Sequence, residues 1–290
     1  ISAGFPRTNQ LKAELETSSL PLGNSATGDF LRTRKPEMEG IPGRYLLNFI
    51  VEADTHMALA NNPLTENAVP RVYDVHIDLD TPENSRIIME NIPYSLMEKA
   101  GELTPAQRLR YAANMIQTVQ NIHSTGIILG DFAPSTKYDK WRLRENGDLV
   151  IIDMGGAVNN NSSALDRELS FLRGHLFTFL TGFEVSGDEN NLFGDLKIKH
   201  GERKKYQHYM ELIDLLSNMD LNNLKFVFAY TAKLIDENNP RVKQVLINWG
   251  LSKGIKDINK IIDLVSSDLR LNVIDEVDRE YLGSLEAYDR

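Results

Sequence analysis

Apolar positions in the second half of the chain recur at the spacing of amphipathic helices. From about residue 166 onward, apolar-rich stretches alternate with asparagine-rich turns. Within each stretch the apolar residues lie three or four positions apart, which is typical of a helix with one buried face. Helices are therefore predicted in ELSFLRGHLFTFLTG, KYQHYMELIDLLSNM, NLKFVFAYTAKLI, VKQVLINWGLSK and DINKIIDLVSS.

Residues 1–92 follow another pattern, in which short apolar runs are separated by turns. Segments 71–80 and 85–92 predict two strands, and a glycine-bearing turn within 14–36 is consistent with a β-hairpin. The stretch from Arg44 to Ala60 predicts an amphipathic helix, because apolar residues recur there at Leu47, Ile50, Val51, Ala58 and Leu59.

A long helix is predicted to begin after Thr104, which precedes Pro105 and lies three residues before Gln107. Gly126 should end it. Its predicted apolar face consists of Leu109, Ala112, Ala113, Ile116 and Val119. A buried strand is expected in 147–153, entered from a turn at Asn146-Gly147.

This order of elements predicts an α+β protein with two lobes. Residues 1–92 form a small β-rich N-lobe with a glycine-bearing loop and one helix. Residues 93–290 form a larger helical C-lobe.

Bulk composition narrows the class of protein. The chain has 290 residues, of which 41% are hydrophobic and 25% charged, as expected of a soluble globular protein. A net charge of −9 argues against nucleic-acid binding. The absence of cysteine excludes disulfides and thiolate metal sites. No apolar run approaches the roughly 20 residues of a membrane span, and the N-terminus lacks the pattern of a signal peptide.

Two aspartates flank the predicted hairpin that includes 147–153. Asp131 follows the helix and a short apolar run, and Asp153 follows the strand. Phosphoryl transfer uses such a pair, because one carboxylate orients the attacking hydroxyl and the other holds Mg²⁺ against the phosphates. Mg²⁺ prefers hard oxygen ligands, which favours Asp153 as the metal ligand.

These motifs resemble those of the protein-kinase-like superfamily. Leu129-Gly130-Asp131 is similar to the catalytic His-Arg-Asp or His-Gly-Asp motif, and Asp153-Met154-Gly155 is similar to Asp-Phe-Gly. The resemblance covers roughly residues 11–182. It implies a bilobal kinase-like fold, with ATP and Mg²⁺ as cofactors and Asp131, Asp153 and Lys35 as catalytic residues.

The resemblance continues in the N-terminal region. LGNSATGDF (22–30) is similar to a glycine-rich loop that keeps Gly23 and Gly28, and Lys35 matches the phosphate-binding lysine. Glu52 then fits as the ion-pair partner of Lys35. Arg34 and Arg32 remain alternatives to Lys35. A hinge at Met89-Glu90-Asn91-Ile92 places Glu90 and Ile92 among the cofactor-binding residues.

Several positions depart from the kinase pattern. Thr136 stands where kinases carry a magnesium-binding Asn, Leu129 replaces the motif's His, and Ala133 stands where serine/threonine kinases carry Lys. Thr136 is the expected second metal ligand, and Asp139 could compensate if the loop folds back.

Three functions therefore stay open. The first is a phosphotransferase acting on a protein hydroxyl. The second is a pseudokinase that serves as a protein-binding module, and the third is a kinase-fold adenylyl transferase. The compact motif set and the lack of cysteine resemble secreted bacterial effector kinases, which implies virulence-related action on a host protein in the host cytosol.

Overall fold

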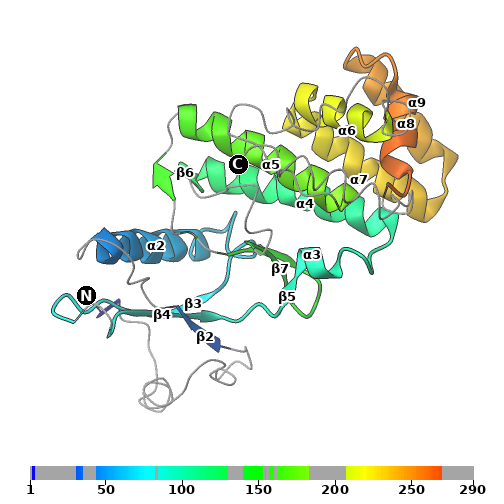
Figure 1. The fold of residues 1–290 in the computed structure, drawn as a ribbon. Helices are drawn as coiled ribbons and strands as arrows, with labels where there is room; N and C mark the ends of the chain where they lie inside the picture. The colour runs from blue at the N-terminus through cyan, green and yellow to red at the C-terminus, as the bar shows by residue number, and fades with distance from the viewer. Residues whose placement is uncertain are drawn as a thin grey trace, which may run out of the picture. The chain divides into compact units, whose positions relative to one another are not determined.

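The protein has an α+β fold in which antiparallel strands combine with helices. The computed structural model describes residues 2–3, 31–34, 44–81, 84–129, 140–152, 154, 157–159, 162–182 and 207–269 (Figure 1). The strands are β1 (Ser2–Ala3), β2 (Leu31–Arg34), β3 (Val72–His76), β4 (Arg86–Glu90), β5 (Tyr94–Ser95), β6 (Ile127–Ile128), β7 (Trp141–Leu143), β8 (Leu149–Ile151) and β9 (Val158–Asn159). The helices are α2 (Arg44–Ala60), α3 (Leu96–Lys99), α4 (Pro105–Ser124), α5 (Ser162–Thr181), α6 (Gln207–Asn218), α7 (Leu221–Glu237), α8 (Pro240–Ser252) and α9 (Ile258–Ser266).

The chain divides into two compact units. The first consists of residues 1–96, 118–131 and 139–164, and the second of residues 97–117, 132–138 and 165–290. All the described strands belong to the first unit. The second unit contains α6 to α9 and most of α5.

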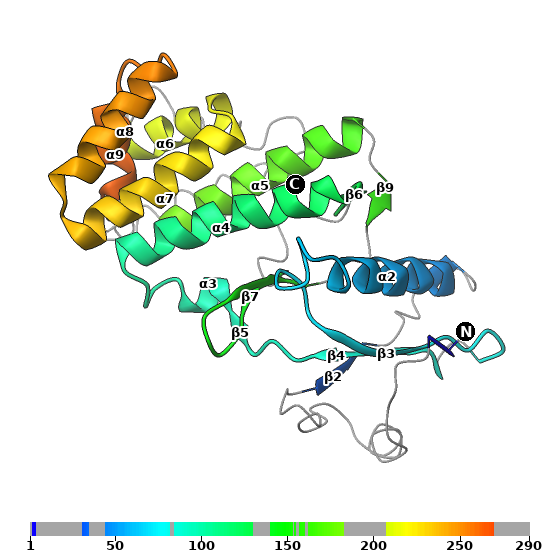
Figure 2. The same cartoon turned by 180° about the vertical axis from the view of Figure 1, so that it is seen from behind.

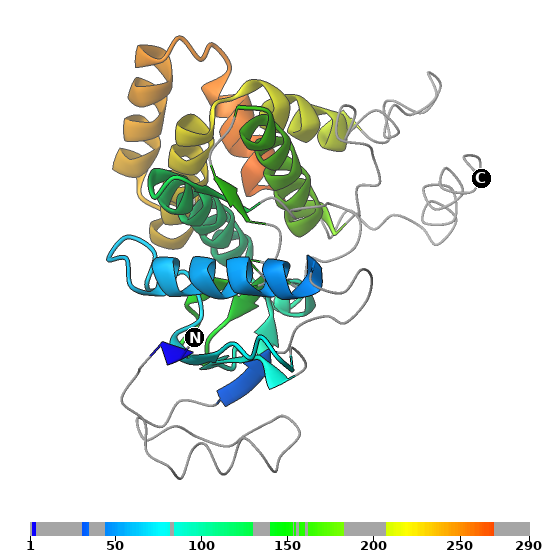
Figure 3. The ribbon, with the colours of Figure 1, turned by 90° about the vertical axis from the view of Figure 1, so that its left-hand side faces the viewer.

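The largest sheet of the first unit has four strands in the order β1-β3-β4-β2. Helix α2 lies over one face of this sheet (Figure 3). Its Phe49 and Ala53 join a buried cluster with Val75, Ile87 and Met89. Burying one large apolar side chain stabilises a protein by about 1.5–3 kcal/mol. Packing on the sheet therefore holds α2 in place, and the predictions of this helix and of strands in 71–80 and 85–92 are confirmed.

The buried face of α2 differs in part from the predicted one. Leu59 is buried and Ile50 packs against the buried cluster, as predicted, but Leu47 is 60% exposed and Val51 is 38% exposed. Phe49 and Ala53, which were not predicted, are buried instead. The helix carries two neighbouring apolar stripes, and the sheet covers the one that contains the aromatic side chain. Periodicity alone did not distinguish these stripes, because both have helical spacing.

Strand β2 is the described part of the predicted hairpin region 14–36. It pairs antiparallel with β4, with Arg34 opposite Ile87 and Arg32 opposite Met89. The glycine-bearing turn itself lies outside the described residues. The predicted local hairpin is therefore untested, while the long-range pairing of β2 is a new finding.

Helix α4 begins as the sequence predicted. The Thr104 N–H donates to the Gln107 side chain at 2.8 Å, and the Gln107 N–H donates to the Thr104 hydroxyl at 3.3 Å. This reciprocal pair satisfies two backbone donors that a helix start otherwise leaves free. Gly126, with φ of 85°, follows the helix end in a conformation that glycine adopts easily. All five apolar positions predicted for the buried face of α4 are buried: Leu109, Ala112, Ala113, Ile116 and Val119.

The second unit gathers α6, α7, α8 and α9 around an apolar interior (Figure 2). Asp220 caps α7 by accepting from the Asn223 N–H, and Asn238 ends it in the left-handed conformation. Helix α8 packs closely on α9 at Gly250, where an added Cβ would lie 2.7 Å from Cγ1 of Ile258. The predicted helices of the C-terminal half are thus confirmed over the described residues.

Candidate functional site

A short β-hairpin forms the centre of the candidate site. Strands β7 and β8 pair with Trp141 opposite Ile151 and Leu143 opposite Leu149. The turn between them uses Gly147, whose φ of 86° suits glycine. This confirms the strand predicted in 147–153 and the turn at Asn146-Gly147.

Two backbone pairings bracket the segments that carry the predicted aspartates. On one side, β6 pairs antiparallel with β9. On the other, the Ile152 N–H donates to the Lys140 carbonyl at 2.9 Å, which extends the hairpin by one pair. Segments 129–139 and 153–157 therefore connect the same two pairings. The described ends of the two segments are thus paired, whereas the aspartates themselves lie outside the described residues.

Most of the predicted site residues lie outside the described residues. These are Gly23, Gly28, Lys35, Asp131, Thr136 and Asp153, together with Asp139. For Asp131 and Asp153, the nearest described neighbours in the chain are buried. Leu129 is buried two residues before Asp131, and Ile152 and Met154 are buried on either side of Asp153. The flanks of both aspartates are thus anchored in the interior of the protein.

Ile92, at the predicted hinge, packs directly on the hairpin. It forms a buried cluster with Val150 and Ile152. Ile92 is 2% exposed and Ile152 is 8% exposed. This cluster begins at the hinge segment and reaches the residue before Asp153. This apolar contact fixes the hinge segment against the hairpin.

Glu90, the other predicted hinge residue, makes a buried bidentate ion pair with Arg144. Arg144 Nε donates to Glu90 Oε1 at 2.7 Å and Nη2 donates to Oε2 at 2.8 Å. The Arg71 N–H donates to the same carboxylate at 3.2 Å. The side chain of Glu90 thus anchors the hairpin turn to the end of β4. The Glu90 N–H also donates to the Arg71 carbonyl at 2.8 Å, and a nucleotide contact by Glu90 stays a prediction.

The segment after α2 strengthens this anchor. The carbonyls of Asn67 and Val69 accept from the Arg144 guanidinium at 2.7 and 3.0 Å. The carbonyl of Ala68, between them, accepts from the Ile151 N–H at 2.8 Å. Three consecutive carbonyls therefore bind the hairpin, so its position relative to the hinge segment is strongly constrained.

Glu52, the predicted partner of Lys35, is buried in α2. Its side chain lies 3.9 Å from Nε2 of His56, which is fully buried one turn later. Burial of a carboxylate requires compensating partners, so Glu52 is not a solvated-face residue. Its pairing with Lys35 concerns a residue outside the described part of the chain and stays a prediction.

Lys140 is a candidate that no motif indicated. It is buried, with 5% exposure, at the end of segment 129–139 and directly before the buried Trp141. Lysine is almost never this buried in the absence of a partner group. Its sequence signal is weak, because only the neighbouring strand residues suggest burial.

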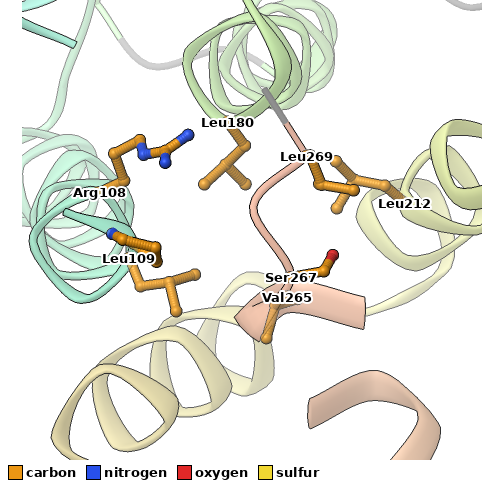
Figure 4. Close-up of a pocket in the computed structure, with 8 residues that line it drawn as sticks. Arg108, Leu109, Leu180, Leu212, Val265, Ser267 and Leu269 are labelled. Atoms are coloured by element: carbon orange, nitrogen blue, oxygen red, sulfur yellow. The ribbon is translucent and has the colours of Figure 1, made fainter. Parts of the chain in front are cut away.

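A small cavity lies in the second unit, remote in sequence from these motifs. Its lining includes Leu109, Leu180, Leu212 and Leu269, with Arg108 projecting beside Leu180 (Figure 4). Its volume of about 10 Å³ is roughly what one water molecule needs. Arg108 is held there by Asp268 at 2.7 Å. This cavity cannot hold a nucleotide.

The described residues contain neither a cluster of metal ligands nor a membrane-spanning helix. Over the described ranges, no group of three or more histidine, cysteine, aspartate or glutamate side chains could hold a metal ion. The predicted magnesium ligands are not among those residues. Within the same part of the chain, none of the helices is long and apolar enough to cross a membrane.

No protein-family model matches the chain, and no curated protein matches it significantly. The functional assignment therefore depends on the residues and their geometry.

Proposed function

We propose that this protein is an ATP- and magnesium-dependent phosphotransferase with a bilobal, protein-kinase-like fold that acts on a protein hydroxyl. The observation that carries the proposal is the pair of backbone pairings, β6 with β9 and Ile152 with Lys140, which join the described ends of the segments that contain Asp131 and Asp153. Juxtaposed carboxylates on two such segments suit phosphoryl transfer.

In this proposal the chain's residues have separate tasks. Asp131 orients the attacking hydroxyl and accepts its proton, while Asp153 and Thr136 supply oxygen ligands for Mg²⁺. The donor set fits this ion, because carboxylate and hydroxyl oxygens are hard ligands. ATP supplies the transferred phosphoryl group, whose bond to the β-phosphate oxygen breaks as the bond to the substrate oxygen forms.

Nucleotide binding is assigned to the hinge and the N-terminal region. The apolar cluster of Ile92, Val150 and Ile152 supports the adenine ring. Gly23, Gly28 and Lys35 hold the phosphates, and the buried Glu52 pairs with Lys35. The buried Glu90–Arg144 pair supports this assignment, since it fixes the end of β4 against the hairpin.

A pseudokinase is the second candidate, favoured by the missing helper residues. Leu129, which stands in place of the motif's His, is 3% exposed and packs as an ordinary core residue. Ala133 and Thr136 also lack the usual groups. The resemblance to secreted bacterial effector kinases extends both candidates to a host-cell protein as substrate or partner.

The test is the intact mass of the purified chain after incubation with ATP and Mg²⁺. A phosphoryl-sized gain by the wild type that is absent in Asp153→Asn and Asp131→Asn supports the enzyme. An adenylyl-sized gain instead indicates the nucleotidyl-transfer alternative. If both variants retain partner binding and the wild type gains no mass with or without that partner, the pseudokinase replaces the enzyme.

A further inference from the structure

Helices α7 and α8 together carry a stack of three aromatic rings. The ring centroid of Phe226 lies 4.2 Å from that of Tyr230 and 4.3 Å from that of Trp249, with interplanar angles of 22° and 23°. Phe226 is thus the middle ring, because each neighbouring ring covers one of its faces. All three residues are only partly buried, so the edges of the stack reach the surface of the two helices.

Exposed apolar surface continues from the stack along α8. Two residues connect α7 to α8, and the stack joins the first half of α7 to the last part of α8, so the two helices run antiparallel. Val245, one turn before Trp249, therefore lies at the level of Tyr230, which is one turn after Phe226. Val245 is 46% exposed. We call the surface made by these three rings and Val245 the α7–α8 face.

Basic residues lie at both ends of this face. Arg241, Val245, Trp249 and Lys253 follow one another at intervals of four residues, so they form a stripe of about 18 Å along α8 and its C-cap. Arg241 and Lys253, the two ends of the stripe, are exposed. Segment 240–256 contains two further lysines and no acidic residue, although the whole chain has a net charge of −9.

The carboxylates of α7 and its N-cap do not neutralise these cations. Each has a partner of its own, which is Asn223 for Asp220, Arg110 for Asp236 and Lys233 for Glu237. Over the part of the chain that the structure describes, neither Arg241 nor Lys253 forms an ion pair. The α7–α8 face therefore combines exposed apolar groups with uncompensated positive charge.

We propose that the α7–α8 face binds an acidic amphipathic helix of a partner protein. Such helices bind apolar surfaces through side chains spaced three or four residues apart. The stripe on α8 defines the order of groups on the partner: two apolar residues one turn apart contact Val245 and Trp249, and a carboxylate one turn beyond each of them pairs with Arg241 or Lys253. Complementary charge of this kind selects the partner and speeds its association. This inference is independent of the proposed nucleotide function.

Trp249 supplies the readout for a binding experiment. The chain has two tryptophans, and the other one, Trp141, is fully buried. The probe is an alanine-based helical peptide of about 18 residues, with two leucines four positions apart and a glutamate four positions outside each leucine. We expect this glutamate peptide to shift the emission of Trp249 to shorter wavelength and to protect it from acrylamide quenching, because the peptide covers the indole. A matched peptide with lysine in place of glutamate should bind at least about 10-fold more weakly.

Variants of α8 locate the binding surface. Val245→Asp places a carboxylate within the apolar surface and should weaken binding of the glutamate peptide by at least about 10-fold. Leu251→Asp is the matched control, because Leu251 is 63% exposed on the same helix but lies two positions from Trp249 and so faces another direction. It should bind as the wild type does.

Two further variants test the charge and the signal. Arg241→Glu combined with Lys253→Glu should reverse the preference, so that the lysine peptide binds better than the glutamate peptide. Trp249→Phe keeps an aromatic ring and should still bind a labelled glutamate peptide, as measured by anisotropy, while the shift of tryptophan emission disappears.

Three results would overturn the proposal. These are no binding of the glutamate peptide at about 1 mM, equal weakening by Val245→Asp and Leu251→Asp, and a peptide preference that the charge reversal leaves unchanged. A shift of Trp249 emission with rising protein concentration, in the absence of peptide, would also overturn it, because a second copy of this chain would then cover the face.

Discussion

The β7–β8 region and the α6–α9 helices bury different kinds of side chains. Around the hairpin, charged groups are buried together with apolar ones: Glu90, Lys140 and Arg144 all lie largely inside. In α6 to α9 the buried residues are almost all apolar, with Tyr209 and Thr231 as polar members. The hairpin therefore depends on paired buried charges, whereas the interior of α6 to α9 depends on apolar packing, although buried charge also occurs elsewhere, at Glu52, Asp74, Arg108 and Glu168.

Among changes in these two regions, breaking the buried Glu90–Arg144 ion pair should lower the free energy of unfolding the most. Arg144→Met leaves the Glu90 carboxylate buried without its bidentate partner and is expected to lower the free energy of unfolding by about 3–5 kcal/mol. Urea denaturation measures this. The exposed Arg241→Met is the control, with an expected change within about 0.5 kcal/mol.

A double variant tests whether the lost stability comes from the unpaired Glu90 carboxylate. Glu90→Met combined with Arg144→Met removes both charges, and most of the lost stability should return, because apolar replacement of a buried pair is often nearly neutral. A single Arg144→Met variant as stable as the wild type would show that the pair does not fix the hairpin.

A substitution that overpacks the contact between α8 and α9 should destabilise the protein by a smaller amount. Gly250→Ala places a Cβ 2.7 Å from Ile258 Cγ1 and is expected to lower the free energy of unfolding by about 1–3 kcal/mol. Gly101→Ala is the matched control, because no atom lies within 4 Å of its added Cβ. Equal stability of the two variants in urea denaturation contradicts the close α8–α9 contact.

The smallest effect is expected at Tyr209, one of the two polar buried residues of this apolar region. Burial raises the pKa of Tyr209 above its ordinary value of 10.0, and its hydroxyl donates to the Leu269 carbonyl at 2.8 Å. The folded chain then keeps a proton that the unfolded chain releases, so the free energy of unfolding falls as pH rises above 10. Tyr209→Phe should lower the free energy of unfolding by about 1 kcal/mol at neutral pH and reduce this alkaline decline. Parallel denaturation curves at neutral and alkaline pH measure both, and an unchanged decline in the variant counts against the titration of Tyr209.

The same two regions show what could be predicted from the sequence. The helices of the C-terminal half and the start of α4 depend on local spacing and on capping residues such as Thr104 and Gln107, so they were predictable. The pairing of β2 with β4 was not, because register between distant segments leaves no local signal. The choice of Phe49 over Leu47 for the buried face of α2 likewise depended on the sheet.

The candidate site was predictable only where it follows motifs. Asp131 and Asp153 stand out by spacing and flanking elements, and Ile92 by its place after a strand. The Glu90–Arg144 pair joins residues 54 positions apart, and the burial of Lys140 follows from the hairpin register. Such long-range placements of charge arise from tertiary structure, which a single sequence does not display.

Hydrogen exchange with and without MgATP tests the central claim most directly. The account predicts that MgATP slows backbone exchange in peptides covering 86–96 and 140–154, while exchange in α6 to α9 stays unchanged. Peptide mass spectrometry resolves these segments in one experiment, with adenosine as a comparison that should protect both segments more weakly, because it lacks the phosphates. Slowing confined to α6–α9, or no change anywhere at saturating MgATP, would contradict a nucleotide site beside the β7–β8 hairpin.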